Sequence, residues 1–395
     1  KEIGVAPLLM TVALLPFTVW FFGQASLVGP VANLVAVPFV SFVIVPLDLA
    51  ACALLFAWPA AGAGMLHLCA YLVDALWWLL LHLAAWKPAM QYLPQPSLVA
   101  FALGCVGAAW LLAPRGVPAR YLGALLLLPL CWPRTVLPPA GAFRATVIDV
   151  GQGLSVLVRT RTHALLFDTG ARYPSGFDLG AAAVVPSLHA LDVAHLDELI
   201  ISHGDNDHAG GAVSVLAAYP DTPVWGGDPA RGPVPMRQCH AGRHWEWDGV
   251  DFRLLGPPAP VTIEGNDAGC VLLVSGEGGR LLLPADTSSK VEPDIAKSVP
   301  PGPPLVLVVP HHGSKTSSSR AYLQALHPRL AVASTGYLNG YHHPAAIVVA
   351  RYASLGIPLL NTPATGAVRV AFPADGPPRI LSEGRRRQAH YWREH

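Results

Sequence analysis

This sequence has few charged side chains and no closely paired cysteines. Lys, Arg, Asp and Glu make up 13% of its 395 residues, whereas soluble domains carry about 25%. None of the six cysteines forms a Cys-x-x-Cys pair, which excludes the usual cysteine-based zinc and dithiol redox motifs. The net charge of +1 gives the chain no general attraction to polyanions. Any such attraction has to come from local patches.

The start of the chain also lacks the features of a secreted protein. It begins Lys1-Glu2 rather than with Met, and its first apolar stretch has no small-residue cleavage pattern. We therefore interpret the sequence as part of a longer protein. Cys239 and Cys270 would form a disulfide if their part of the chain faces an oxidising compartment, and unpaired thiols are the alternative. Cysteine usage alone leaves the compartment open.

Charge is distributed very unevenly along the chain, because only eight of the charged residues lie within residues 1–140. Apolar runs that approach or reach the length of a membrane span occur at Val5–Phe22, Val37–Trp58, Met65–Trp86, Leu98–Ala113 and Tyr121–Cys131. We therefore predict that residues 1–135 form an α-helical polytopic segment in a lipid bilayer. The basic residues beside these runs give no clean orientation.

Three polar residues within the apolar half are candidates for lining a pore. Asn33 lies between Pro30 and Pro38, where the prolines predict a broken or re-entrant element of the kind that lines permeation paths. Asp48 and Asp74 fall inside apolar runs, and an intramembrane carboxylate is costly and often functional. The alternative is that each aspartate lies near a helix end or pairs with a hydroxyl group or a histidine.

From Phe143 onward the pattern changes to short apolar runs bounded by Gly and Pro, which predicts strands. The expected strands are Ala145–Val150, Ser155–Arg159, Ala164–Phe167, Glu198–Ser202, Pro223–Trp225, Phe252–Leu255, Cys270–Ser275, Arg280–Pro284, Leu305–Val309, Leu330–Ser334 and Val368–Phe372. Helical patterns lie at Ala181–Ala190, Ala212–Tyr219, Ser319–Leu326 and Ala345–Leu355. This mixture favours an α/β sandwich over residues 140–380, with two mixed sheets and outer helices. Residues 381–395 are predicted to be a basic, aromatic tail.

Several of these strands end in metal-binding residue types. The run His203-Gly204-Asp205-Asn206-Asp207-His208 follows one strand, Asp286 follows a second, and Pro310-His311-His312-Gly313-Ser314 follows a third. One strand-terminal aspartate alone is more often a turn cap. Together, imidazole and carboxylate donors suit a divalent metal that polarises a carbonyl or phosphoryl oxygen and activates water. Two further aspartates also follow strands: Asp149, in Asp149-Val150-Gly151-Gln152-Gly153, and Asp168. We expect Asp168 to hold the metal loop in place by bonding to a metal ligand rather than to the metal itself.

This combination of motifs resembles the metallo-β-lactamase fold, an αββα sandwich. Behind a membrane segment, it is similar to the ComEC family of DNA-uptake competence proteins, over nearly the whole chain. The resemblance implies a multi-pass protein of the inner membrane that passes single-stranded DNA. It also implies a metal-dependent phosphodiesterase or deoxyribonuclease domain that degrades the other strand, with other competence proteins as partners and a homo-oligomer as an option.

The resemblance also implies roles for individual residues. The metal ligands would be His203, Asp205, Asp207, His208, Asp286 and His312, with one or two divalent ions. Asp207 would orient or deprotonate water, His311 would face the substrate, and His343 would contact phosphate or protonate the leaving group. Asn266, Ser314 and Lys315 would bind substrate, and Asp149 and Asp168 would support the ligands. A polar helix cap is the alternative for Ser314, Lys315 and their neighbours.

Two departures from the general fold pattern bear on the metal. Asp205 stands where hydrolytic members usually have a second histidine, and Asn266 stands where a later histidine is expected. Both replace nitrogen by oxygen, which favours manganese over zinc and keeps magnesium open. A domain that binds DNA or a partner without hydrolysis, and a membrane-tethered hydrolase of another phosphodiester or lactone, remain alternatives.

Overall fold

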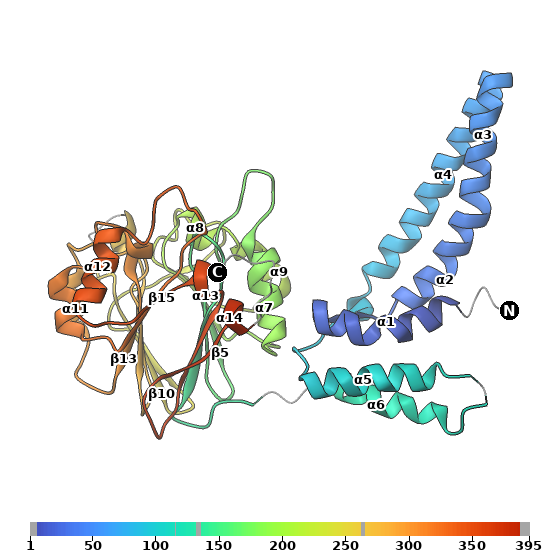
Figure 1. Ribbon diagram of the computed structural model, residues 1–395. Helices are drawn as coiled ribbons and strands as arrows, with labels where there is room; N and C mark the ends of the chain where they lie inside the picture. The colour runs from blue at the N-terminus through green and yellow to red at the C-terminus, as the bar shows by residue number, and fades with distance from the viewer. Residues whose placement is uncertain (1–5, 115, 132–135, 262–264, 388–395) are drawn as a thin grey trace. The chain divides into compact units, whose positions relative to one another are not determined.

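The computed structural model describes residues 6–114, 116–131, 136–261 and 265–387 (Figure 1). The chain divides into two compact units with a boundary near residue 135. Each unit is described by itself. The expected tail residues 388–395 and the basic residues Arg115 and Arg134 lie outside the described residues.

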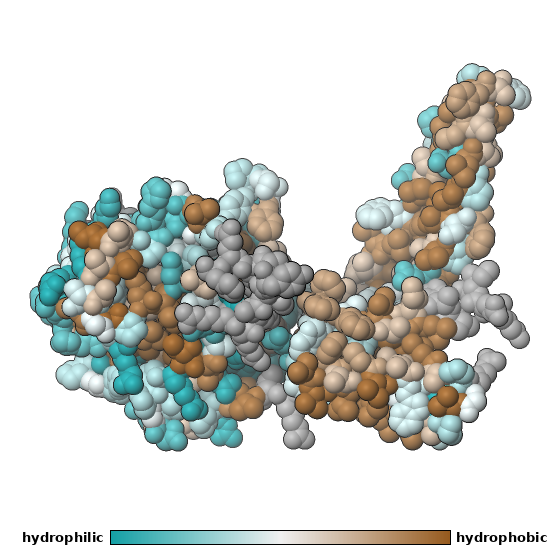
Figure 2. All heavy atoms as spheres, in the orientation of Figure 1, coloured by the Kyte–Doolittle hydropathy of each residue, from teal (hydrophilic) through white to brown (hydrophobic). Residues whose placement is uncertain are grey.

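The N-terminal unit is helical, and each of the five predicted apolar runs overlaps its helices. The helices are α1 (Ala6–Phe22), α2 (Gly29–Phe39), the π-helix η1 (Val40–Ile44), α3 (Val45–Ala57), α4 (Pro59–Ala84), α5 (Leu98–Leu111) and α6 (Gly123–Cys131), and the short strands β1 (Gln24–Ser26) and β2 (Met90–Tyr92) pair. The helices Gly29–Ala57 and Pro59–Ala84 are long and apolar enough to cross a membrane. Figure 2 shows hydrophobic side chains along their outer surfaces.

The predicted break around Asn33 is wrong. Residues Gly29–Ala57 form one helix of 29 residues. Pro30 lies in its first turn, where the missing N–H has no intrahelical acceptor. Pro38 and Pro46 flank the π-helical turn, where the hydrogen-bond ladder is already irregular. Asn33 therefore lies on a continuous helix, as do Asp48 in α3 and Asp74 in α4, and all three side chains are exposed.

The C-terminal unit is a sandwich of two mixed sheets, as predicted. One sheet has the order β17-β16-β3-β4-β5-β6-β7-β8 and the other β15-β14-β13-β12-β11-β10-β9. The predicted strands correspond to β3 (Phe143–Val147), β4 (Val156–Arg159), β5 (Ala164–Phe167), β6 (Glu198–Ile201), β7 (Val224–Gly226), β10 (Val250–Gly256), β11 (Val271–Ser275), β12 (Arg280–Leu283), β13 (Leu305–Val308), β14 (Leu330–Ala333) and β16 (Val368–Phe372). Four further strands, which the sequence analysis missed, are β8 (Arg237–Gln238), β9 (His244–Trp247), β15 (Leu359–Asn361) and β17 (Arg379–Glu383).

Helices flank the sheets on both sides (Figure 1). The predicted helices correspond to the π-helix η4 (Gly180–Val184) with α7 (Val185–Ala190), α9 (Ala212–Ala218), α11 (Arg320–Leu326) and α12 (Ala346–Ser354), and α10 (Glu292–Ser298) and α13 (Thr362–Thr365) were missed. The core between the sheets contains buried Phe143, Phe167, Phe252 and Phe372. A second apolar cluster, which includes Leu307 and Tyr322, lies beneath α10–α12. Burying each large side chain contributes about 1.5–3 kcal/mol, so this core holds the loops at the strand ends in place.

Part of the predicted tail belongs to the folded domain. Residues 381–387 belong to β17 and to the short helix α14 (Gly384–Arg387). β17 pairs with β16, and Arg385 forms an ion pair with Asp149. The boundary at residue 381 is therefore wrong, because the backbone of this segment is bonded into the sheet.

Cys239 and Cys270 form a disulfide bond. Both residues are completely buried in the core between the sheets. The backbone N–H of Cys270 also donates to the carbonyl of Ser202, the residue before His203. The disulfide thus lies beneath the loop that carries the first metal-binding motif.

Candidate metal centre

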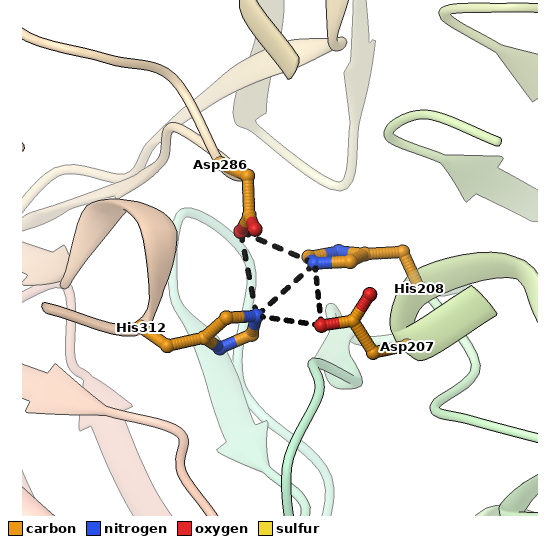
Figure 3. A group of neighbouring side chains, drawn as sticks. All are labelled: Asp207, His208, Asp286 and His312. Atoms are coloured by element: carbon orange, nitrogen blue, oxygen red, sulfur yellow. Dashed lines mark hydrogen bonds and ion pairs between the residues drawn. The ribbon is translucent and has the colours of Figure 1, made fainter. Parts of the chain in front are cut away.

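Four of the predicted ligands meet at one end of the sandwich (Figure 3). Asp207 and His208 lie in the short helix α8 (Asn206–Ala209) after β6, Asp286 follows β12, and His312 lies in the 3-10 turn η6 (Pro310–Gly313) after β13. One ligand atom from each of the four side chains lies within 4.8 Å of the others. β6 belongs to the eight-stranded sheet, whereas β12 and β13 belong to the seven-stranded sheet. The cluster therefore forms only where both sheets are packed together.

The donor atoms of this cluster point at one another. Oδ1 of Asp286 lies 3.1 Å from Nε2 of His208 and 3.5 Å from Nε2 of His312. Oδ2 of Asp207 lies 3.3 Å from Nε2 of His312. The two Nε2 atoms are themselves 3.2 Å apart. Two imidazole nitrogens and two carboxylates at these separations need a positive charge among them.

In both His208 and His312, the Nδ1 atom makes a hydrogen bond outside the cluster. Nδ1 of His312 donates to the backbone carbonyl of Ser334 at 2.8 Å. Nδ1 of His208 donates to Asp168 at 2.7 Å, and Asp168 also accepts from the backbone N–H and the hydroxyl of Ser202. Since each Nδ1 carries a proton, each neutral ring presents the lone pair of Nε2 to the centre. This orientation fits a divalent metal ion.

The pKa shifts of the four residues also indicate that the cluster favours a positive charge. Burial disfavours the imidazolium, yet the nearby carboxylates outweigh it and raise the pKa values of His208 and His312. Burial likewise opposes ionisation of Asp207, but His312 and His208 lower its pKa to about 2. Asp286 also has a lowered pKa, because His312 and His208 outweigh its burial. A metal ion that binds here replaces protons.

Strained backbone carries two of the histidines. His311 and His312 have φ values of 51° and 53°, in the left-handed region that non-glycine residues rarely adopt. Gly313 follows with φ 81°, and a Cβ there would lie 2.6 Å from the Cβ of Pro344. The loop beyond is held by Glu292, whose carboxylate accepts from the N–H groups of Ser318 and Ser319. Such strain persists only where the surroundings enforce it, and it is common at functional sites.

The first glycine-rich loop supports the centre through its backbone. Leu154 N–H donates to the carbonyl of Asp207, and a Cβ on Gly153 would lie 2.4 Å from that same oxygen. Ser334 completes the link, because its hydroxyl donates to the carbonyl of Gly153. Asp149 does not share this role. Its carboxylate pairs with Arg385 at 2.9 Å and, within the described residues, makes no contact with the cluster.

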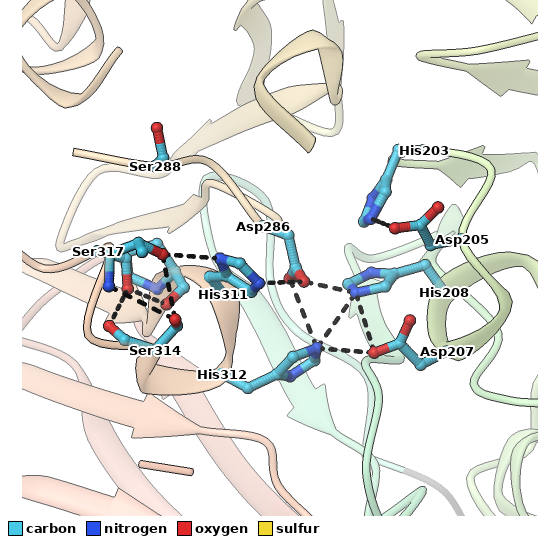
Figure 4. Close-up of polar contacts among 12 residues, drawn as sticks. His203, Asp205, Asp207, His208, Asp286, Ser288, His311, His312, Ser314 and Ser317 are labelled. Carbon is cyan, nitrogen blue, oxygen red and sulfur yellow. Dashed lines mark hydrogen bonds and ion pairs between the residues drawn. The ribbon is translucent and has the colours of Figure 1, made fainter. Parts of the chain in front are cut away.

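His203 and Asp205 lie beside the cluster rather than in it (Figure 4). Nε2 of His203 lies 3.5 Å from Oδ2 of Asp205, and the His203 ring lies 4.3 Å from the His208 ring. Asp205 also pairs with Arg231 at 3.0 Å. Its hydrogen bond to His203 outweighs its partial burial and lowers its pKa. A second ion would have to compete with Arg231 for this carboxylate.

On the other side of Asp286 lies His311, with Nε2 3.7 Å from Oδ2 (Figure 4). Burial lowers the pKa of His311. Thr316 contacts its Nδ1 at 3.4 Å, and Ser314 and the exposed Lys315 lie in the same turn. The sequence analysis allowed a residue of this polar run to cap the next helix. The cap of α11 is Ser319, whose hydroxyl accepts a hydrogen bond from the N–H of Tyr322. Neither Ser314 nor Lys315 caps this helix, and Lys315 is exposed.

His343 and Asn266 stand further out. The ring of His343 lies 6.1 Å from that of His311, and its backbone is held by Asn339. Burial and the nearby histidines lower the pKa of His343. Asn266 lies in the 3-10 turn η5 (Gly265–Ala268), where its backbone carbonyl accepts from Gly269. Within the described residues its side chain makes no contact with the cluster.

Some residues that support the centre were missed by the sequence analysis. Ser202 and Ser334 bond to Asp168 and His312, and Asp267 accepts from the N–H and the hydroxyl of Ser288, two residues after Asp286. Ser202 directly precedes the metal motif and could have been suspected on that ground. Ser334 and Asp267 are ordinary polar residues whose roles depend on long-range packing.

Comparisons with known proteins agree with this fold. Residues 148–337 match the model of the metallo-beta-lactamase superfamily. The C-terminal unit is therefore a domain of that superfamily, whose fold implies that it binds divalent metal. Residues 1–118 match the model described as competence protein.

Several relatives align with nearly the whole of this chain. Competence protein ComA of Neisseria gonorrhoeae is 38% identical over 95% of this chain and 52% of its own length. Uncharacterized protein YcaI of Escherichia coli is 31% identical over 93% of the chain and 48% of its own length. ComE operon protein 3 of Bacillus subtilis is 26% identical over 94% of the chain and 52% of its own length. The chain therefore combines a competence-protein domain with a metallo-beta-lactamase domain, as the resemblance to the ComEC family predicted.

The chain spans about half the length of these relatives. The competence-protein match and the two long apolar helices together indicate a membrane protein.

Proposed function

We propose that this protein takes part in DNA uptake at the inner membrane, where its C-terminal domain is a metal-dependent nuclease. The observation that carries the proposal is the cluster of Asp207, His208, Asp286 and His312, with both Nδ1 atoms engaged elsewhere. A divalent ion there would polarise a phosphoryl oxygen and lower the pKa of bound water. Its two carboxylates favour manganese, with magnesium or zinc as the other ions to test.

The side chains around the cluster have separable tasks. The low pKa of Asp207 makes its carboxylate a weak base, so it would orient water rather than take its proton. His311 lies outside the cluster, 3.7 Å from Asp286, and would contact the substrate. The lowered pKa of His343 keeps its ring neutral near pH 7, which favours a hydrogen bond to phosphate over proton donation. Ser314 and Lys315 would hold neighbouring phosphate oxygens.

The N-terminal helices would supply the path for single-stranded DNA, together with other competence proteins, further membrane segments or a second copy of the chain. Asn33, Asp48 and Asp74 are exposed on the long helices and remain the pore candidates. A polar side chain in lipid is costly unless it faces water or a partner. Accessibility of a cysteine placed at each position to a water-soluble thiol reagent, in membranes, tests this assignment.

The test of the nuclease uses the whole chain in detergent, stripped of metal. Single- and double-stranded DNA are offered with manganese, magnesium or zinc, beside Asp207→Ala and the matched surface variant Asp251→Ala. Cleavage that requires metal, is lost in Asp207→Ala and persists in Asp251→Ala supports the proposal. Bound metal without cleavage would contradict the nuclease and leave a DNA- or partner-binding domain. Hydrolysis of lactones or lipid phosphodiesters, but not DNA, would point to another substrate.

A further inference from the structure

A pocket of about 190 Å³ lies beside the metal loop. It is lined by Gly204, Asn206, Ala209 and Gly210 of that loop and by Arg172, Arg231 and Pro233. None of these residues belongs to the four-residue cluster, although Asp207 and His208 lie in the same loop. The pocket thus places two arginines beside the loop that carries Asp207 and His208.

Arg231 is packed closely against the loop. A Cβ on Gly204 would lie 2.7 Å from the Cβ of Arg231, so a larger residue at position 204 would displace it. The guanidinium pairs with Oδ1 of Asp205 at 3.0 Å and lies 3.9 Å from Asp228. The Arg231 side chain is nevertheless 59% exposed. An exposed ion pair of this kind contributes only about 0–1 kcal/mol, so another anion can replace Asp205 at little cost.

Arg172 approaches the same pocket from the segment after β5. Its backbone N–H donates to Oδ1 of Asn206 at 3.1 Å, and its side chain is exposed. Within the described residues its guanidinium has no ion pair. The position of its main chain is therefore fixed by the metal loop, while its charge is available to a ligand.

We propose that this pocket binds a phosphate group of the DNA chain next to the phosphate at the metal centre. Arg172 and Arg231 supply the positive charge, and Arg231 exchanges Asp205 for phosphate oxygens. The identity of the ligand rests on the proposed function. Guanidinium groups bind phosphate oxygens through paired N–H donors, and two of them would fix the path of the strand beside the scissile bond.

The first test measures DNA binding by the whole chain in detergent with a chelator present, so that neither metal nor hydrolysis contributes. The probe is a fluorescein-labelled oligothymidylate, followed by anisotropy between about 50 and about 200 mM salt. Arg231→Gln and Arg172→Gln should each weaken binding about 10-fold. Each should also reduce the slope of log affinity against log salt by about 0.7. The matched control is Arg253→Gln, since Arg253 is also an exposed arginine paired with an aspartate.

The second test examines the exchange itself. Asp205→Asn releases Arg231 and should tighten metal-free binding several-fold. The same substitution in the Arg231→Gln background should give no gain, because no arginine remains to be released. A gain of equal size in both backgrounds would reflect only the loss of a negative charge and would overturn the exchange.

The outcomes separate this inference from the proposed function. Binding by Arg231→Gln and Arg172→Gln that matches Arg253→Gln, or no binding by the unaltered chain, overturns the pocket. Arginine-dependent binding in a protein that never cleaves DNA overturns the nuclease and supports the pocket. Cleavage combined with binding that ignores both arginines overturns the pocket alone.

Discussion

The imidazole of His208 and the carboxylate of Asp168 are joined by a 2.7 Å hydrogen bond, and both side chains are completely buried. Asp168 is not among the residues that face the metal centre, yet it determines which nitrogen of His208 does so. Its φ of 61° is unusual for a residue other than glycine. In this backbone conformation the Asp168 carboxylate accepts hydrogen bonds from both Ser202 and His208.

This relationship predicts the effect of Asp168→Asn. The variant keeps the volume of the side chain but loses the charge that fixes the His208 tautomer, so metal affinity should fall about 10- to 100-fold. The affinity is measured by titrating the metal-free chain with manganese. Asp251→Asn, a change of the same type on the surface, should bind metal as the unaltered protein does. Unchanged affinity in Asp168→Asn would contradict the role of this residue.

The adjacent residues His311 and His312 should have different roles. His312→Gln removes a donor from the cluster and should abolish tight binding of the ion. His311→Gln should leave the metal content unchanged and lower DNA cleavage about 10- to 100-fold, because His311 contacts Asp286 from outside the cluster. Metal content by elemental analysis and cleavage rates distinguish the two. Loss of metal in both variants would place His311 among the ligands.

Metal binding should weaken as the pH falls. The carboxylates raise the pKa values of His208 and His312, so below those values each ring holds a proton on the nitrogen that faces the ion. The metal has to displace these protons, and its affinity therefore rises with pH, by up to about 100-fold per pH unit where both protons are released. Calorimetric titrations in buffers of different ionisation enthalpy count the released protons. Binding without proton release would contradict the raised pKa values.

The disulfide should contribute to stability. Cys239→Ala with Cys270→Ala removes a bond between residues 31 apart in the sequence, and it should lower the free energy of unfolding by about 2–4 kcal/mol. Thermal unfolding of the chain in detergent measures the loss. Cys52→Ala with Cys131→Ala is the control, because these cysteines are exposed and unpaired. A reductant should lower the melting temperature of the unaltered chain and leave that of the Cys239/Cys270 double variant unchanged.

The sequence predicted the parts of this structure that depend on local pattern. β5, β6, β12 and β13 are fully buried runs, and the groups that follow them can be found by noting where each run ends. The strands that were missed are short or polar, such as β8 and β9, and depend on pairing with a neighbour. The broken element expected between Pro30 and Pro38 was wrong, because a proline in the first turn or beside a π-helical turn does not end the helix.

Long-range polar contacts were beyond the reach of sequence patterns. Asp149 follows a strand just as Asp168 does, yet it pairs with Arg385, 236 residues away. Asp205 lies in the same motif as Asp207, and its pairing with Arg231 depends on a loop with no motif of its own. In both cases the sequence motif identifies the carboxylate, but its partner depends on the tertiary fold.

The two sheets contribute candidate ligands to the same centre, Asp207 and His208 from one and Asp286 and His312 from the other. An ion held by all four is a cross-link between the halves of the sandwich. Force applied to the domain by a strand under tension would load this cross-link as well as the apolar core. Metal occupancy should then set how much pulling the domain withstands before its sheets separate, which gives the ion a mechanical task in addition to its chemical one.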